Sequence, residues 1–289
     1  MRIAAARRAL LVSLLASLGA TTLRAQDAAH SPPPYLQIFQ EQVKPGRGGL
    51  HPALESGWPR AFARAKIQNH YIGMSTMYGA SEAWFCAGVR SIAEIEEQNA
   101  AMEKAPGLSK ELDRLAQADA ANISGNRVVL ARYHPEFSNQ PDINPAEMRF
   151  WEVLTFTVRP GHEGDFAQAA QLYRSVVEGA KATLPWATYE VMAGMPGPVF
   201  LIFVPHKTLA EIDPATGPTA AIEKSMTQET MKKLGTLSEG FSSVETRILA
   251  VNPEMSYPLP KWVEQDPDFW GKKTKETASR SSAPAAGSQ

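Results

Sequence analysis

The sequence lacks the local motifs that identify the commonest enzyme classes. It contains no Gly-x-Gly-x-x-Gly, Walker-type loop, His-Glu-x-x-His, Cys-x-x-Cys or Gly-x-Ser-x-Gly. The sequence therefore has none of the local motifs typical of nucleotide-binding proteins, zinc proteases and α/β-hydrolases. No two of the six histidines lie three or four residues apart, so no helix offers a pair of imidazoles to a metal ion. The sequence predicts no metal site.

Cysteine is nearly absent, because Cys86 is the only one in 289 residues. In an oxidising compartment this chain would be stabilised by burial of apolar surface and not by intramolecular disulfides. Cys86 lies in the apolar segment 83–87. We interpret it as a small core residue, with a reactive or pairing thiol as the alternative.

Hydrophobic runs long enough to span a bilayer are also missing. The apolar run Ala9–Leu18 falls well short of the roughly 20 residues that a transmembrane helix needs. It follows Arg7-Arg8 and is succeeded by the small residue Ala25, as in a secretory signal peptide over residues 1–25. We therefore expect a periplasmic or secreted protein that has no membrane association once the signal is removed.

Excess positive charge is absent as well. The formal net charge is −1, and residues 1–25 contain four arginines and no acid, so their removal leaves −1 − 4 = −5. An acidic chain is a poor candidate for binding the phosphates of nucleic acids. We predict no nucleic-acid partner, and the sequence leaves monomer and homodimer open.

The chain does contain a duplication. Val43-Lys44-Pro45-Gly46-Arg47 returns 115 positions later as Val158-Arg159-Pro160-Gly161-His162. The same spacing of 115 relates further pairs, namely Trp58 with Tyr173, Met77 with Met192, Gly79 with Gly194, and Phe85 with Phe200. Repetition at a fixed spacing indicates one structural unit written twice.

Each copy has the pattern strand, helix, hairpin, helix, strand, which is the βαββαβ order of a ferredoxin-like unit. The strands carry apolar residues on both sides, for example Trp151 on one side and Phe150 on the other. The sheet face that no helix covers must therefore also be buried against another part of the protein. We predict an α+β fold: two tandem ferredoxin-like βαββαβ units whose antiparallel sheets pair into a single-chain pseudo-dimeric barrel.

The predicted segments follow from this duplication. They are a signal peptide (1–25), a Pro-rich leader (26–34), repeat 1 (35–134), a linker (135–148), repeat 2 (149–256), a C-terminal arm (257–270) and a disordered tail (271–289). The arm carries Trp262, Phe269 and Trp270, so we expect it to pack across the body of the protein.

The element order and the strand-Val-x-Pro-Gly-helix entries at Val43 and Val158 resemble the dimeric α+β barrel superfamily. The pattern is similar to NIPSNAP-like and antibiotic-biosynthesis-monooxygenase-like domains. That resemblance covers about residues 35–255 and implies the barrel fold. It also implies a range of activities, since the superfamily includes cofactor-independent oxygenases, haem-using enzymes and proteins of no assigned activity, and fold alone does not give function.

Three residues are candidates for proton transfer. His70 and His206 lie at strand ends, where a histidine can accept a proton or ligate a haem; the alternative is a rim residue hydrogen-bonded to backbone or water. Glu152 is expected to be half-buried, which would raise its pKa; the alternative is a structural carboxylate paired with Arg149 or Arg247. We interpret the other histidines, His51 among them, as solvated or capping residues.

Aromatic residues on facing strands, together with one acid, suit a small-molecule pocket. The predicted ligand-binding residues are Tyr71, Tyr78, Trp84, Trp151, Trp186, Tyr189 and Glu190. Core packing is the alternative role. We expect an exported protein that binds a small apolar or aromatic molecule, with no required cofactor. The alternatives are a monooxygenase-like oxidoreductase that uses haem as an option, and a fully packed structural or interaction protein.

Overall fold

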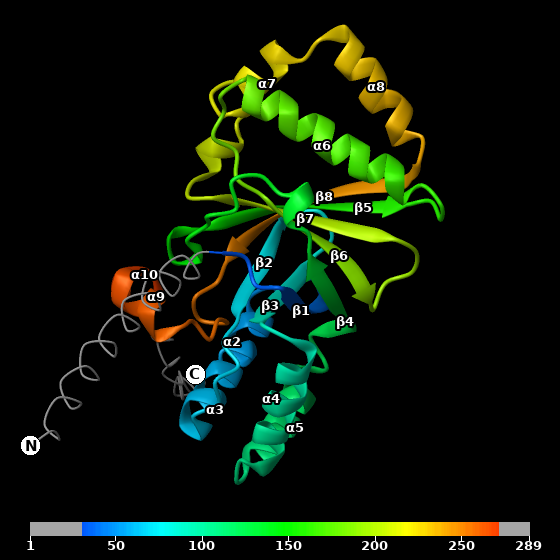
Figure 1. The fold of residues 1–289 in the computed structure, drawn as a ribbon. Coiled ribbons are helices and arrows are strands. Elements are labelled where there is room, and N and C mark those ends of the chain that lie inside the picture. Colours follow the sequence, from blue (N-terminus) through cyan, green and yellow to red (C-terminus); the bar gives the residue numbers. More distant parts are fainter. Residues whose placement is uncertain (1–30, 272–289) are drawn as a thin grey trace, which may run out of the picture.

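The computed structural model describes residues 31–271, which form a closed barrel between two groups of helices (Figure 1). The strand order around the barrel is β1-β3-β2-β8-β5-β7-β6-β4, and neighbouring strands are antiparallel. The strands are β1 (Tyr35–Val43), β2 (Ile72–Tyr78), β3 (Glu82–Val89), β4 (Ile123–Tyr133), β5 (Phe150–Val158), β6 (Ala187–Ala193), β7 (Val199–His206) and β8 (Phe241–Val251).

Two pairings between the repeats close the barrel. Repeat 1 contributes β1 to β4 and repeat 2 contributes β5 to β8, and each sheet has two edge strands. β2 pairs with β8 at Met74 and Val251, and β4 pairs with β6 at Arg132 and Glu190. Closure leaves no strand edge of the barrel unpaired, which removes a route to aggregation. The predicted α+β fold, with tandem ferredoxin-like units sharing one barrel, is confirmed.

The helices cover the outside of the barrel on opposite sides (Figure 1). Repeat 1 has α2 (Leu50–Glu55), α3 (Gly57–Ala65), α4 (Ile92–Lys104) and α5 (Leu108–Asp119). Repeat 2 has α6 (Glu163–Gly179), α7 (Thr219–Ser225) and α8 (Gln228–Ser238), and the C-terminal arm forms α9 (Pro260–Gln265) and α10 (Pro267–Trp270). Short 3-10 turns lie at Pro135–Phe137, Pro145–Glu147 and Leu209–Ile212.

The repeated Val-x-Pro-Gly motif is a tight turn in both copies. Gly46 has φ +78° and Gly161 has φ +88°, the left-handed values that the third position of a type II turn requires and that glycine adopts without strain. In each turn the N–H of the residue after glycine donates to the carbonyl of the residue before proline at 3.0 Å. The motif therefore sets how the chain leaves the first strand of each repeat.

The middle of the barrel is filled with apolar side chains. Ile38, Val129, Val153, Leu201 and Leu249 are fully buried there, one from each of five strands. Alternate residues of a strand face opposite sides, so the remaining positions meet the helices. The interior is a packed core over most of its length, and any open space must lie toward an end.

The predicted signal peptide, most of the leader and nearly all of the tail lie outside the described residues. Pro33, within the leader, is described, and its carbonyl accepts a hydrogen bond from the Tyr189 hydroxyl at 3.2 Å. Among residues 31–271, no helix is both long enough and apolar enough to cross a membrane.

Candidate functional site

One end of the barrel interior is polar. On β1 the inward-facing Leu36 and Ile38 are buried, whereas Gln40 and Gln42, next on the same face, line a cavity of about 380 Å³. Other strands change in the same way, since Leu249 on β8 is succeeded toward this end by Arg247. The lining residues of this barrel-end cavity are Gln40, Glu41, Gln42, Ala80, Glu82, Trp84, Gly125, Asn126, Arg127, Thr155, Thr157, Met195, Glu245 and Arg247.

The charges on one wall of the barrel-end cavity are internally paired. Arg247 Nε lies 3.0 Å from Glu82 Oε2, and another nitrogen of its guanidinium lies 2.8 Å from Glu245 Oε2. The indole of Trp84 donates to the same Glu82 oxygen at 2.8 Å. Trp84 is only 2% exposed and forms part of the cavity floor. Much of the remaining polar lining consists of amide and hydroxyl groups.

The C-terminal arm packs against the apolar core of the barrel. Trp270 is buried in that core, and its indole donates to the Ala146 carbonyl at 2.9 Å. Arg149 forms an ion pair with Asp266, and its guanidinium carbon lies 3.9 Å from the centre of the Phe269 ring. These contacts fix the arm to the linker and the start of β5, away from the residues that line the barrel-end cavity.

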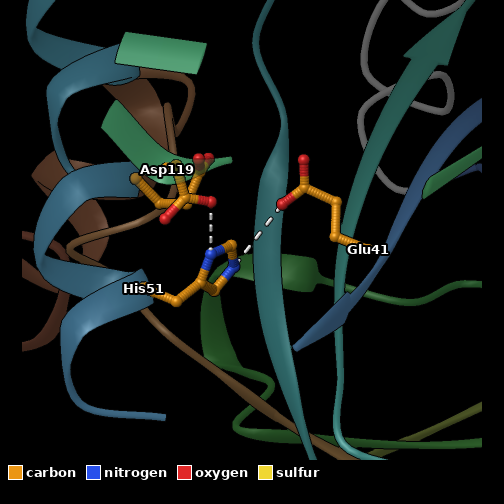
Figure 2. A group of neighbouring side chains, drawn as sticks. Glu41, His51 and Asp119 are labelled. Carbon is orange, nitrogen blue, oxygen red and sulfur yellow. Dashed lines mark hydrogen bonds and ion pairs between the residues drawn. The ribbon is translucent and has the colours of Figure 1, made fainter. Parts of the chain in front are cut away.

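A second polar site is buried between the sheet and the helices of repeat 1. It consists of Glu41, His51, Glu55 and Asp119, here called the His51 cluster, and one ligand-type atom from each residue lies within 4.8 Å of those of the other three. Figure 2 shows His51 between Asp119 and Glu41. His51 Nδ1 lies 2.7 Å from Asp119 Oδ2, and Nε2 lies 3.5 Å from Glu41 Oε2.

Local structure explains how these four side chains meet. His51 and Glu55 are four residues apart on α2 and therefore share one helix face. Glu41 lies near the end of β1, and Asp119 is the last residue of α5. Asn122 holds the second oxygen of Asp119 through a hydrogen bond of 2.8 Å, so the carboxylate that faces His51 is fixed from behind.

Burial changes the proton affinity of two of these carboxyl groups. Burial, with the charges of Glu41 and Asp119, raises the pKa of Glu55 to about 9. Burial and the charge of Asp119 raise the pKa of Glu41 to about 7. Both effects follow from placing like charges together where water cannot solvate them. Near neutral pH, Glu55 therefore holds a proton and Glu41 holds one part of the time.

Of the predicted proton-transfer residues, the structure brings two together. His206 is 3% exposed, and its Nε2 lies 3.6 Å from Glu152 Oε2 while its Nδ1 lies 3.9 Å from Glu211 Oε2. The alternative role for Glu152, a structural pair with Arg149 or Arg247, is not found, because Arg149 pairs with Asp266 and Arg247 pairs with Glu82. None of these histidine and glutamate residues lines the barrel-end cavity.

His70 lies apart from that pair. Its ring stacks on Tyr257 with the centres 4.4 Å apart, and burial lowers the pKa of His70. Neither His70 nor His206 lines the barrel-end cavity, so neither is placed to ligate a haem bound there.

The predicted ligand-binding residues are dispersed. Trp84 lines the barrel-end cavity, whereas Trp151 and Tyr189 belong to the packed core inside the barrel. Tyr71 and Trp186 are buried on the outer face of the barrel, beneath the helices of repeat 1 and repeat 2 respectively. Alternation along a strand explains this separation, because odd and even positions face different compartments.

The remaining two members of that predicted set lie near the surface. Tyr78 is 64% exposed. Glu190 accepts hydrogen bonds from Arg132 at 2.7 Å and from His134 at 2.9 Å, and these bonds lower the pKa of Glu190 against the effect of its partial burial. Glu190 is thus a member of a surface ion-pair network.

His51 is the residue that sequence reasoning misjudged. The prediction of a solvated or capping histidine is wrong, because His51 is 1% exposed. One signal of the cluster is the spacing of four residues between His51 and Glu55, which places both on one face of α2. A search for paired histidines alone does not detect it. A second signal lay in the duplication, where the position 115 residues after His51 is Phe166.

No protein-family model and no curated protein matches the sequence. Solved structures similar to the chain include an anthrone oxidase-like protein (9% identity, 76% of this chain and 92% of that chain, TM-score 0.49). A chlorite dismutase from Candidatus Nitrospira defluvii is 7% identical, with 83% of this chain and 98% of that chain covered and a TM-score of 0.47. A dye-decolorizing protein from V. cholerae is 8% identical, with 78% of this chain and 95% of that chain covered and a TM-score of 0.46. At this identity the likeness gives no activity or ligand for this chain, and the predicted barrel architecture rests on the strand order described above.

Proposed function

We propose that the protein binds a small, hydroxyl-bearing polar molecule in the barrel-end cavity. The observation that carries this proposal is the lining, in which five uncharged hydrogen-bonding side chains surround one space. These are Gln40, Gln42, Asn126, Thr155 and Thr157. A volume of about 380 Å³ lies within the usual range for small-molecule sites. The proposed ligand is polar, in contrast to the apolar or aromatic one expected from the sequence.

The chemistry of the lining indicates the class of ligand. Amide side chains both donate and accept hydrogen bonds, and threonine hydroxyls do the same, so they complement hydroxyl groups in either role. Arg247 is already paired with Glu82 and Glu245, so this wall does not require a ligand of opposite charge. Trp84 supplies an apolar floor against which the carbon skeleton of a polyol can pack.

The proposal is tested by calorimetric titration of the mature chain with myo-inositol and glucose, and with 1-naphthol as an apolar probe. We expect binding of a polyol and none of 1-naphthol. Replacing Thr155 and Thr157 together by valine keeps their shape but removes two hydroxyls. Since each hydrogen bond contributes about 1 kcal/mol, affinity should fall roughly tenfold or more.

Thr246→Val is the matched control, because Thr246 is exposed on β8 and does not line the barrel-end cavity. Its affinity should equal that of the unaltered protein. Equal affinity in the double valine variant, or preference for 1-naphthol over both polyols, would refute the proposal.

The oxidoreductase alternative is tested in protein purified from its own host. A retained ligand appears as additional mass in native mass spectrometry, whereas a bound haem appears as a Soret band. A retained polyol without a Soret band supports small-molecule binding, and a Soret band with substrate turnover supports the monooxygenase-like alternative that uses haem.

We also propose export, on the basis of the signal-like residues 1–25. Mature protein from the periplasm or medium should then begin at Gln26. Retention of Met1 in protein from the cytoplasm would refute this proposal.

A further inference from the structure

The His51 cluster contains buried polar atoms without hydrogen-bond partners. His51 Nε2 and Glu41 Oε2 are both shielded from solvent, and neither forms a hydrogen bond. They face one another at 3.5 Å, beyond ordinary hydrogen-bond length. Because buried polar atoms are nearly always satisfied in native proteins, such a pair indicates a missing partner between them.

Their separation matches two ligands of one metal ion. Bonds of about 2.1 Å to an ion, at a tetrahedral angle, place two ligand atoms about 3.4 Å apart. His51 Nε2 and Glu41 Oε2 lie 3.5 Å apart. Glu55 offers an oxygen within 4.8 Å of these atoms, close enough for a side-chain torsion to complete the set.

Asp119 has a different position relative to His51. It accepts from the opposite ring nitrogen, Nδ1, at 2.7 Å, and its other oxygen is held by Asn122. A histidine that ligates a metal commonly donates its second N–H to a carboxylate, which fixes the tautomer and the ring orientation. Asp119 is therefore placed to direct the lone pair of Nε2 toward Glu41.

Repeat 2 provides an internal control for what the fold itself requires. The positions 115 residues after Glu41, His51 and Glu55 are Phe156, Phe166 and Ala170. Leu237 corresponds to Asp119, because Asp119 lies four residues before the first paired residue of β4 and Leu237 lies four residues before that of β8. All four residues are apolar, and the ring centres of Phe156 and Phe166 are 5.5 Å apart. The fold is thus stable with a hydrophobic core at this place.

The polar residues of repeat 1 consequently need a reason other than folding. Burying several carboxylates together is costly, and replacing buried charges by apolar residues of similar size is often neutral or stabilising. A divalent cation lowers this cost, because its two positive charges balance the carboxylates of Glu41 and Glu55, while Asp119 is stabilised by its hydrogen bonds with His51 and Asn122.

We propose that the His51 cluster is a binding site for one divalent transition-metal ion, ligated by His51 Nε2 and the carboxylates of Glu41 and Glu55. Asp119 acts as the positioning residue behind His51. The two sites share Glu41, which also borders the barrel-end cavity, whereas His51, Glu55 and Asp119 do not line that cavity.

The ligand set indicates the class of metal. One imidazole nitrogen with two carboxylates suits Zn²⁺, Mn²⁺ or Fe²⁺. Calcium prefers six to eight oxygen ligands, and the soft Cu⁺ ion prefers thiolates and thioethers, neither of which the cluster provides. Three protein ligands also leave a coordination position for water or another small ligand.

The test uses the mature chain, stripped with a chelator and dialysed against Zn²⁺, Mn²⁺ or Ca²⁺. Elemental analysis should give one Zn²⁺ or Mn²⁺ per chain and no retained Ca²⁺. Co²⁺ serves as a spectroscopic probe, because its visible bands report ligation by His51. The first variant, His51→Phe, introduces the residue type found at the equivalent position of repeat 2, Phe166. It should lower the Zn²⁺ affinity at least 100-fold and abolish the Co²⁺ bands.

Asp119→Asn separates positioning from ligation. It should retain one ion per chain but weaken the affinity roughly 10- to 100-fold. Glu55→Gln is the second variant, for use if His51→Phe does not fold, because glutamine has nearly the same shape as glutamate. It should also weaken Zn²⁺ binding. His162→Gln is the control, because His162 is about half exposed and lies in repeat 2.

Three results would overturn the proposal: less than one-tenth of an ion per chain, a Zn²⁺ affinity that His51→Phe and Glu55→Gln leave unchanged, or a loss of affinity in His162→Gln equal to that in His51→Phe. None of them concerns polyol binding, so failure of this site is distinguishable from failure at the barrel-end cavity.

Discussion

Glu55→Gln should stabilise the metal-free protein in a way that depends on pH. Burial raises the pKa of Glu55 to about 9 from its ordinary value of 4.5. Between these values the folded chain keeps a proton that the unfolded chain releases, so the native contribution of Glu55 is largest below pH 4.5 and declines as pH rises through 9. Glutamine imitates the protonated acid and does not titrate.

The magnitude follows from how far the pH lies above 4.5, the pKa of a glutamate that burial does not perturb. Each pH unit above that value lowers the unfolding free energy of the unaltered chain by about 1.4 kcal/mol. At pH 7 the difference between Glu55→Gln and the unaltered protein should thus reach about 3 kcal/mol, and at pH 4.5 it should be close to zero. Proton sharing with Glu41 and Asp119 makes this an upper value.

The assay is urea unfolding in the presence of a chelator, at pH 4.5, 6 and 7. Glu96→Gln, on the exposed face of α4, is the control and should show no comparable change with pH. A difference for Glu55→Gln that stays constant over this range would show that Glu55 holds no proton in the folded protein, and would refute the reasoning from burial.

Two further predictions concern the core. Trp270→Ala should lower the free energy of unfolding by about 3 to 5 kcal/mol, because Trp270 fills the barrel core and donates to Ala146; Trp270→Phe, the milder control in urea unfolding, should cost clearly less, and equal small losses would contradict the packing of the arm. The Cys86 thiol is partly buried against the barrel core, and this burial raises its pKa to about 12. At pH 8 the folded protein should therefore react with Ellman's reagent more slowly than the urea-unfolded protein, and similar rates would contradict this.

The fold could be predicted from the sequence because both copies of the duplicated unit carry the same turn residues. Pro-Gly at Pro45 and Pro160 marks the same turn, and left-handed φ values at the two glycines leave few other residue choices. A βαββαβ order fixes which strands neighbour one another in each sheet. The edge strands of the two sheets then need partners, and in the structure β2 pairs with β8 and β4 with β6.

The candidate sites were less accessible, because alternation shows that two faces exist but not what each face meets. Tyr71 and Trp84 were both assigned to a pocket, yet one is buried beneath helices and the other lies on the cavity floor. His51 was hidden for a different reason. Asp119 lies 68 residues from His51 in sequence, and Glu41 belongs to strand β1 and not to the helix of His51. Only the packing of the helices on the sheet brings the three side chains together.

The duplication itself suggests why the polar cluster occurs in one repeat only. Both repeats contribute strands to one barrel, so the apolar core around Phe166 in repeat 2 stabilises the same closed structure that repeat 1 belongs to. Repeat 1 can therefore carry the buried carboxyl groups of Glu41 and Glu55 without losing the fold. Binding of a metal ion to the folded chain alone would add stability by mass action. The stability of repeat 1 would then depend on the supply of that ion.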